Sequence, residues 1–359
     1  MAYSTISKPS LHFNTLTWTG DSGTQSFTGV GFQPDLVWSK ARVALTGITG
    51  SHFLYDAVRG AGAEKELRSN DTGNEGSSAN QVYGYVSSFD SDGFTTTAGS
   101  SNNKYFNESS KTYAAWNWKA NGSGSANNDG SITSTVSVNT TAGFSIVKWE
   151  AAANATIGHG LGVKPAMVIT KSRDNATNWA SWHKSLTGGN EEDRYINLNA
   201  TTAGATYTDY WGTGGFTSSV FGVLSSGFHN NALSMIAYCF AEKKGYSKFG
   251  SYTGNANTDG TFVYTGFKPA MIIIKNTTSA NGWEIYDNKR STFNVVGNYL
   301  NPNATNAEVT GGSDFDFLSN GFKLRTTNST RNNTNNVYLY MAFAAEPLVA
   351  NVGQSIPAT

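Results

Sequence analysis

The sequence predicts an all-β protein made of three tandem antiparallel β-sandwich repeats with a jelly-roll-like architecture. Two observations predict this fold: a composition that suits strands and turns, and a set of motifs that recurs three times in one order. Only 14% of the 359 residues are charged, so the polar surface must come mainly from Asn, Ser, Thr and Gly. Because surface helices usually carry Glu, Lys and Arg, this composition favours short strands joined by turns.

The clearest recurring motif is a strand, found as GFQPDLVWSK at 31–40, GVKPAMVITK at 162–171 and GFKPAMIIIK at 266–275. In each copy a proline is followed six residues later by a lysine, giving Pro34 and Lys40, Pro165 and Lys171, and Pro269 and Lys275. A proline at the start of a continuous apolar run is typical of a strand buried on both faces. We expect the three lysines to be solvated at the strand ends or to pair with nearby carboxylates.

Further motifs follow each of these strands in the same order. An aromatic cluster comes first, then a Gly-Phe turn at Gly93, Gly227 and Gly321, then a closing strand of small and aromatic residues. The cluster contains Asp56 and Arg59 in the first copy and Asp287 and Arg290 in the third, whereas the middle copy has His183 and Leu186. The Asp-x-x-Arg pair predicts a charge-assisted bond that fixes a loop. Residues that recur in every copy are better explained by the needs of the fold than by chemistry.

These motifs divide the chain. The predicted parts are an N-terminal segment at 1–9, repeats at 10–119, 142–243 and 246–346, a polar linker at 120–141 and a C-terminal tail at 347–359. The alternation ITSTVSV within the linker leaves an edge strand open as a second interpretation. The tail is apolar enough to dock on a neighbouring molecule, as an attachment segment would, and we expect its deletion to impair assembly.

Several classes of function are disfavoured. Lys plus Arg and Asp plus Glu both total 25, so the chain lacks the positive charge that nucleic-acid binding requires. The only cysteine, Cys239, excludes a disulfide framework, and no phosphate-binding loop or nucleophile elbow appears, so we expect no cofactor. No run of apolar residues is long enough for a transmembrane helix, and the first residues lack the features of a signal peptide. We therefore expect that, if the protein reaches the outside of a cell, it leaves by a route other than the signal-peptide pathway.

The best candidate for a binding surface is aromatic. The middle copy carries Trp182 and His183, followed by Tyr207, Tyr210 and Trp211. Trp and Tyr rings flanked by Asn and Asp suit sugars, because C–H faces stack on the rings while hydroxyls take hydrogen bonds. The competing interpretation is that these rings are core. It is favoured for Trp182, whose equivalents recur in the other copies, and both interpretations are open for Tyr207, Tyr210 and Trp211.

Two acidic or amide-rich loops are weaker candidates. Asn255, Asn257 and Asp259 imitate the start of a calcium-binding loop, but Gly266 stands where a bidentate Glu belongs, so a polar turn is favoured. No metal site is therefore assigned. A cluster of carboxylates at 191–193 is the main candidate for a polysaccharide depolymerase, which would need two facing carboxylates. Adjacent carboxylates on such a loop are more often solvated surface, so we predict no catalytic residues.

In combination, these motifs resemble a known family. MAYSTISKPSLHFN, GFQPDLVWSK, FLYDAVRGAG, YAAWNWKA and NNDGSITSTVSVNTTAGFSIVKW are similar to an uncharacterised family of repeat-bearing proteins from marine and cyanobacterial tailed phages. Its members are labelled tail fibre, tail-tip or structural virion proteins. The resemblance implies assembly in the host cytoplasm, a place in the virion and contact with the host surface. It supplies no catalytic residues.

Two functions follow as expectations. The first is a tail fibre, spike or tip protein that presents β-sandwich modules to a host surface glycan. The second is a capsid decoration or head-fibre protein with a purely structural role. In either case the expected partners are other virion proteins and further copies of this chain, with a homotrimer as the expected oligomer. Nucleic acid and membrane insertion are not expected.

Overall fold

The prediction of an all-β fold is confirmed. The computed structural model describes residues 4–78, 80–150, 154–224 and 233–347. In this part of the chain, helix is confined to α1 (Asn80–Tyr83), α2 (Ser329–Asn332) and the 3-10 turns η1 (Pro9–Leu11) and η2 (Glu191–Asp193). None of the helices among these residues is long and apolar enough to cross a membrane.

Three large antiparallel sheets share one strand order. The first sheet runs β1 (Phe13–Thr19), β8 (Thr112–Trp118), β3 (Leu36–Ala41), β4 (His52–Asp56) and β5 (Leu67–Arg68). The third runs β19 (Ser247–Thr253), β26 (Val337–Pro347), β21 (Phe267–Asn276), β22 (Trp283–Asp287) and β23 (Tyr299–Leu300). In each, the entry strand pairs with the closing strand, and the closing strand pairs with the strand that carries the motif lysine.

The second sheet keeps this order and extends it at both ends. Its strands are β16 (Ala205–Thr206), β15 (Arg194–Asn197), β14 (Ala180–His183), β13 (Met167–Ser172), β18 (Ser234–Phe240), β11 (Phe144–Glu150), β10 (Ser134–Asn139) and β9 (Ser125–Asn127). Strands β9 and β10 come from the segment at 120–141. The segment therefore forms strands, but the predicted strand is not the edge, because β10 pairs with β11 on one side and with β9 on the other.

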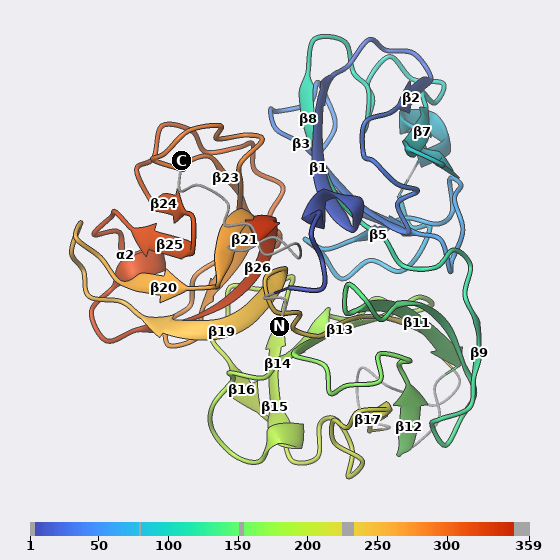
Figure 1. Ribbon diagram of the computed structural model, residues 1–359. Helices are drawn as coiled ribbons and strands as arrows, with labels where there is room; N and C mark the ends of the chain where they lie inside the picture. Colours follow the sequence, from blue (N-terminus) through green and yellow to red (C-terminus); the bar gives the residue numbers. More distant parts are fainter. Residues whose placement is uncertain (1–3, 79, 151–153, 225–232, 348–359) are drawn as a thin grey trace.

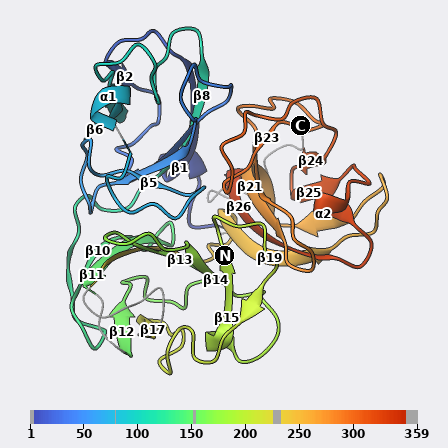
Figure 2. The ribbon, with the colours of Figure 1, turned by 180° about the vertical axis from the view of Figure 1, so that it is seen from behind.

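A small sheet covers the outer face of each large sheet. These are β2 (Gln25–Phe27), β7 (Gly93–Thr97) and β6 (Tyr85–Asp90); β12 (Ala155–Gly158) and β17 (Val220–Val223); and β20 (Phe262–Tyr264), β25 (Gly321–Leu324) and β24 (Phe315–Leu318). A separate hydrophobic cluster fills the space between the two layers of each pair. Each pair is therefore a two-layer β-sandwich, and the three pairs, called the first, second and third units, surround a common centre (Figures 1 and 2).

The inner faces of the three large sheets meet in one hydrophobic core. Trp118, Phe240 and Phe343 occupy the same register position on the three closing strands, opposite Leu36, Met167 and Met271. Their ring centroids lie 5.7 to 6.1 Å apart in edge-to-face contacts. The strands with the apolar runs, β3, β13 and β21, lie between this shared core and the small sheets. They are therefore buried on both faces, as the apolar runs predict.

The recurring glycines of the Gly-Phe turns have a steric explanation. A Cβ on Gly93 would lie 1.9 Å from the carbonyl oxygen of Phe27, and a Cβ on Gly321 would lie 2.1 Å from that of Val263. Only glycine therefore lets these turns approach the neighbouring strand so closely. The third member, Gly227, lies outside the described residues, as does the C-terminal tail from residue 348 onward.

Candidate functional site

The expectation that the recurring lysines are solvated is wrong. Lys40, Lys171 and Lys275 are all buried, with at most 2% of each residue exposed. Their ammonium groups donate hydrogen bonds chiefly to main-chain carbonyls rather than to carboxylates. Burial lowers the pKa of each lysine to about 8.

Each of these lysines reaches into a different unit. Lys40 of the first unit donates to the Thr305 carbonyl of the third at 3.3 Å, and Lys171 of the second donates to the Thr72 carbonyl of the first at 3.2 Å. Lys275 of the third closes the ring by donating to the Thr201 carbonyl of the second at 2.9 Å. Equivalent lysines thus bind the three units to one another in a cycle. We call these contacts the first–third, second–first and third–second interfaces.

Buried tryptophans follow the same pattern. Trp179 of the second unit donates its indole N–H to the Arg68 carbonyl of the first unit at 2.7 Å. Trp283, at the equivalent position of the third unit, donates to the Asn197 carbonyl of the second at 3.0 Å. Trp179 is itself fully buried, so the recurring aromatic cluster belongs to the core and also serves contacts between units.

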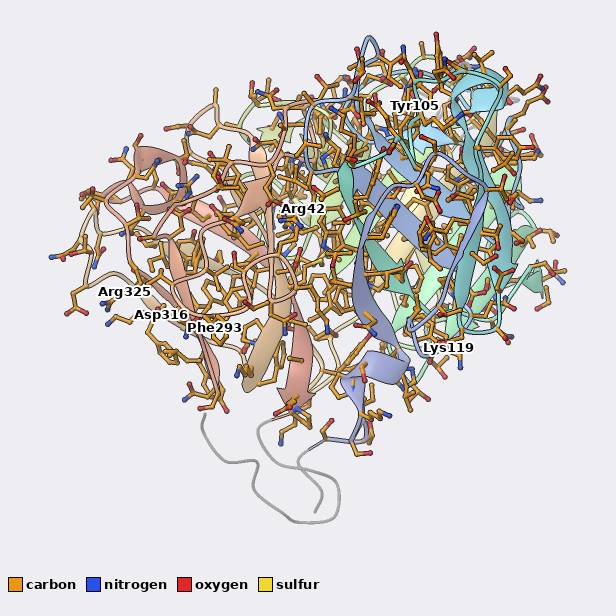
Figure 3. All side chains as sticks on the ribbon, turned by 90° about the horizontal axis from the view of Figure 1, so that it is seen from above. Arg42, Tyr105, Lys119, Phe293, Asp316 and Arg325 are labelled. Carbon is orange, nitrogen blue, oxygen red and sulfur yellow. The ribbon has the colours of Figure 1, made fainter. Side chains whose placement is uncertain are left out.

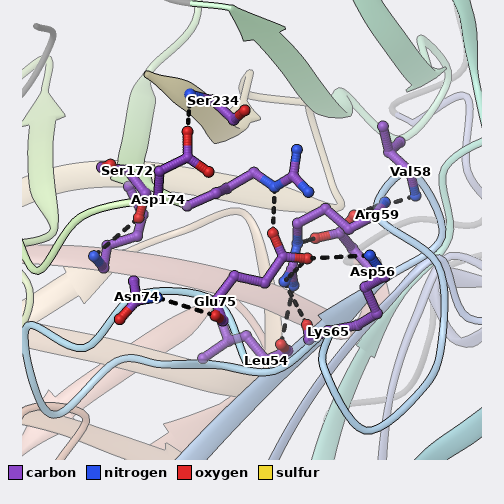
Figure 4. Close-up of polar contacts among 12 residues, drawn as sticks. Leu54, Asp56, Val58, Arg59, Lys65, Asn74, Glu75, Ser172, Asp174 and Ser234 are labelled. Atoms are coloured by element: carbon purple, nitrogen blue, oxygen red, sulfur yellow. Dashed lines mark hydrogen bonds and ion pairs between the residues drawn. The ribbon is translucent and has the colours of Figure 1, made fainter. Parts of the chain in front are cut away.

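The Asp-x-x-Arg pairs form the predicted charge-assisted bonds. Asp56 and Arg59 lie 2.5 Å apart, and so do Asp287 and Arg290, with all four side chains buried. Figure 4 shows Asp56 and Arg59 with Glu75 beside them. Each aspartate also accepts a bond from another unit: Asp56 from the Tyr238 hydroxyl at 2.8 Å, and Asp287 from the Trp116 indole at 3.0 Å.

A second ion pair reinforces two of the three interfaces. Arg42 binds Glu308 at 2.8 Å across the first–third interface, where Glu308 also pairs with Arg290 at 3.0 Å. Figure 3 places Arg42 at the boundary of these two units. Arg173 pairs with Glu75 across the second–first interface in the same way.

The third–second interface differs from the other two at the position of the arginine and at both positions of the Asp-x-x-Arg pair. Thr277 stands two residues after Lys275, where the other units have Arg42 and Arg173 after their lysines. On the facing side, His183 and Leu186 replace the Asp-x-x-Arg pair, and His183 contacts the Tyr340 carbonyl at 3.2 Å. Burial lowers the pKa of His183 to about 3, so the ring is neutral. The middle copy thus departs from the Asp-x-x-Arg motif at the interface where the facing unit has Thr277 in place of the arginine.

Four of the five candidate surface residues belong to the interior, which confirms the interpretation favoured for Trp182 and decides the open one for Tyr210 and Trp211. Trp182, His183, Tyr210 and Trp211 are buried. Trp182 stacks on Phe216 with ring centroids 3.9 Å apart, and Tyr210 stacks on Tyr195 at 4.2 Å. Trp182, Tyr210 and Trp211 are covered because the loop after β15 and the small sheet fold over them and complete the outer core of the second unit. His183 is covered instead by the third unit.

Tyr207 is the exception, with 53% of the residue exposed. It lines an open pocket of about 560 Å³, to which Thr208 and Asp209 add a hydroxyl and a carboxylate. Asp193 fixes the pocket: its carboxylate accepts the Asp209 main-chain N–H at 2.7 Å, and its carbonyl accepts the Tyr207 N–H at 2.8 Å. We call this the Tyr207 pocket. An exposed ring beside hydroxyl and carboxylate groups can stack on a sugar and bind its hydroxyls.

The loop considered for calcium is a polar turn. The side-chain oxygen of Asn255 accepts the Asn257 main-chain N–H at 3.1 Å, and that of Asn257 accepts the Asp259 N–H at 2.9 Å. Asp259 pairs with Lys323 at 2.6 Å. These oxygens therefore hold the turn between β19 and β20. Among the described residues, no group of three or more His, Cys, Asp or Glu could hold a metal ion.

Sequence reasoning missed an exposed aromatic in the third unit. Phe293 has 84% of the residue exposed and borders a cavity of about 340 Å³ together with Lys268 and Phe317. Figure 3 labels it in the third unit. Its surroundings, Ser-Thr-Phe-Asn, carry no periodic pattern, so nothing in the sequence separates it from a buried aromatic.

Comparison with known proteins identifies one family. No curated protein and no solved structure matches the chain. A family model described as a domain of unknown function, DUF7483, matches residues 8–347 and so covers all three units. The chain belongs to the DUF7483 family.

Proposed function

We propose that this protein is a non-enzymatic structural and recognition component of a tailed-phage virion. The resemblance to repeat-bearing virion proteins motivates the proposal. We place the protein in the tail, as a fibre, spike or tip module that contacts a glycan on the host surface.

The observation that best supports a recognition role is that the recurring residues lie between the units, whereas residues specific to one unit form an open pocket. The recurring lysines, tryptophans and Asp-x-x-Arg pairs are buried between units. The Tyr207 pocket is built from unit-specific residues and is open to solvent. A body braced internally in this way can hold surface loops in fixed positions, which reduces the entropy lost when a ligand binds.

The Tyr207 pocket is the proposed contact for the glycan. The ring of Tyr207 would stack on a sugar face, while Thr208 and Asp209 would bind hydroxyl groups. The neighbouring loop, whose Gly189 also lines the pocket, is held by Arg194, whose guanidinium donates to the carbonyls of Leu186 and Gly188 at 2.9 and 2.7 Å. The pocket thus needs little rearrangement to accept a ligand.

Two experiments test the proposal. Cryo-electron microscopy of particles bound by a labelled antibody fragment should place the protein on the tail. Label on the capsid lattice would favour the decoration protein instead, and particles without label would refute a virion role.

A glycan array with host surface polysaccharides tests the pocket. Tyr207→Ala should weaken binding about tenfold, which corresponds to about 1.4 kcal/mol, without changing the melting temperature. Phe293→Ala is the matched control, because it removes an exposed aromatic from a different unit. Equal losses in both variants would contradict a role for the Tyr207 pocket.

A further inference from the structure

The Tyr207 pocket carries negative side chains but no positive ones. Its lining includes the carboxylates of Asp193 and Asp209, and none of the described residues that line it is Lys, Arg or His. It lies beside β16, the edge strand at one end of the second large sheet, whose Thr206 lines it (Figure 1). Because carboxylates repel anions and attract cations, the charge of a ligand affects whether it binds here.

The basic residues next to the pocket are engaged elsewhere. Arg194 directs its guanidinium to main-chain carbonyls. It donates at 2.7 to 2.9 Å to those of Leu186, Gly188 and Gly189. Lys164 pairs with Glu191, the first residue of η2, at 2.5 Å. Within the described part of the chain, neither cation therefore forms an ion pair with a carboxylate that lines the pocket.

The two carboxylates of the pocket have different roles. Both oxygens of Asp193 accept main-chain N–H groups, from Asp209 at 2.7 Å and from Asn190 at 3.0 Å. The carboxylate of Asp209, in contrast, makes no hydrogen bond or ion pair with any other residue that the structure describes. Asp193 therefore shapes the pocket, whereas the carboxylate of Asp209 is available to a ligand.

The turn that carries Tyr207 and Asp209 is held on both sides. Asp209 has a φ of +53°, a left-handed conformation that Asp and Asn adopt more readily than most residues, and its carbonyl accepts the Gly212 N–H at 2.7 Å. The Tyr207 carbonyl accepts the Tyr210 N–H at 3.0 Å, and the two rings meet edge to face with centroids 6.4 Å apart. The exposed ring and the carboxylate therefore flank the pocket from a fixed backbone.

We propose that the Tyr207 pocket selects an amino sugar whose nitrogen is unsubstituted and positively charged. Asp209 would accept a charge-assisted hydrogen bond from the ammonium group, which is stronger than a bond between neutral groups. Tyr207 would stack on the sugar, and the face of its ring also attracts a nearby cation. An N-acetylated sugar would keep the stacking but lose the charge-assisted bond, and an acidic sugar would meet carboxylates of its own sign. The inference rests on the proposed function, whose glycan it narrows to one chemical class.

The test compares two sugars that differ only at the nitrogen. The full-length protein is titrated by calorimetry at pH 6 and low salt with the chitosan tetramer, whose amino groups are free and protonated, and with the chitin tetramer, in which they are acetylated. The chitosan tetramer should bind about tenfold more tightly, equivalent to about 1.4 kcal/mol, and its binding alone should weaken as salt is added. Polygalacturonate, an acidic polysaccharide, should not bind.

Asp209→Asn separates the charge of the pocket from its shape. Asparagine also tolerates the left-handed conformation, so the variant should melt at the temperature of wild type. It should weaken binding of the chitosan tetramer about tenfold and that of the chitin tetramer much less, so that the preference between them disappears. Asp129→Asn is the matched control and should keep the preference, because Asp129 is an exposed carboxylate next to β9, at the opposite end of the same sheet. Tyr207→Ala should weaken binding of both tetramers, because stacking does not depend on the nitrogen.

Four results would overturn the proposal. They are no binding of the chitosan tetramer, equal affinities for the two tetramers, binding of polygalacturonate as tight as that of the chitosan tetramer, or equal effects of Asp209→Asn and Asp129→Asn. In each case, binding of another glycan that is lost in Tyr207→Ala would leave the proposed function standing. A Tyr207→Ala variant that binds every glycan as wild type does would instead refute the pocket itself.

Discussion

Asp287→Asn should destabilise the whole molecule, because this carboxylate joins two units. Its oxygens accept bonds from the Arg290 side chain at 2.5 Å, the Arg290 and Lys289 main chain at 2.9 and 3.0 Å, and the Trp116 indole at 3.0 Å. The substitution removes the negative charge and leaves the Arg290 guanidinium buried. Glu308 at 3.0 Å still compensates part of that charge.

The expected loss can be bounded from these contacts. Removing one partner of a buried ion pair costs about 3–5 kcal/mol, and the remaining Glu308 places the expected loss near the lower end, about 3 kcal/mol. Urea denaturation at pH 7 measures it. Asp259→Asn is the matched control, because Asp259 forms a similar ion pair with Lys323 but its side chain is 82% exposed. Equal denaturation midpoints for the two variants would refute the reasoning.

Three further predictions concern buried groups and close approaches. The pKa of Lys275, lowered to about 8 by burial, means that the unfolded chain binds the extra proton up to about pH 10.5. Wild-type stability should therefore rise relative to Lys275→Met between pH 8 and 10, and a constant difference would contradict this. The pKa of His183, lowered to about 3, predicts that wild type loses stability relative to His183→Gln as the pH falls from 6.5 to 4, which acid denaturation of both proteins would test. Gly93→Ala should lower stability by at least about 2 kcal/mol more than Gly122→Ala, because only the former places a Cβ against the Phe27 carbonyl; thermal melts showing equal losses would count against the steric explanation.

The strand motifs could be predicted from the sequence because their causes are local. An apolar run after Pro34, Pro165 or Pro269 indicates a strand buried on both faces whatever covers it. The Asp-x-x-Arg bond is also local, since both partners lie within one turn of chain. These features recur in the sequence with their spacing preserved, and the structure has them where the spacing indicates.

The lysines show where local reasoning stops. Nothing near Lys40 in the sequence indicates that it is buried, because its acceptor across the interface, Thr305, belongs to another unit. The recurrence of these lysines was nevertheless informative about their burial. A charged side chain that recurs at the end of three buried strands is more often held by a structural partner than exposed to solvent. The partners became visible only once the three sheets were placed around one core.

The aromatic residues of the second unit show a different limit. Trp182, Tyr207, Tyr210 and Trp211 lie in similar polar surroundings in the sequence, yet only Tyr207 is exposed. Burial of the others depends on Phe216 and on the small sheet that folds over them.

Differential scanning calorimetry of the full-length protein tests most directly the claim that recurring residues bind three units into one body. The shared core and the cyclic contacts of Lys40, Lys171 and Lys275 predict one transition, with a ratio of calorimetric to van't Hoff enthalpy of about 1. Asp287→Asn should move that single transition to lower temperature without splitting it. Two or three separable transitions, or a variant that melts the third unit alone, would contradict the account.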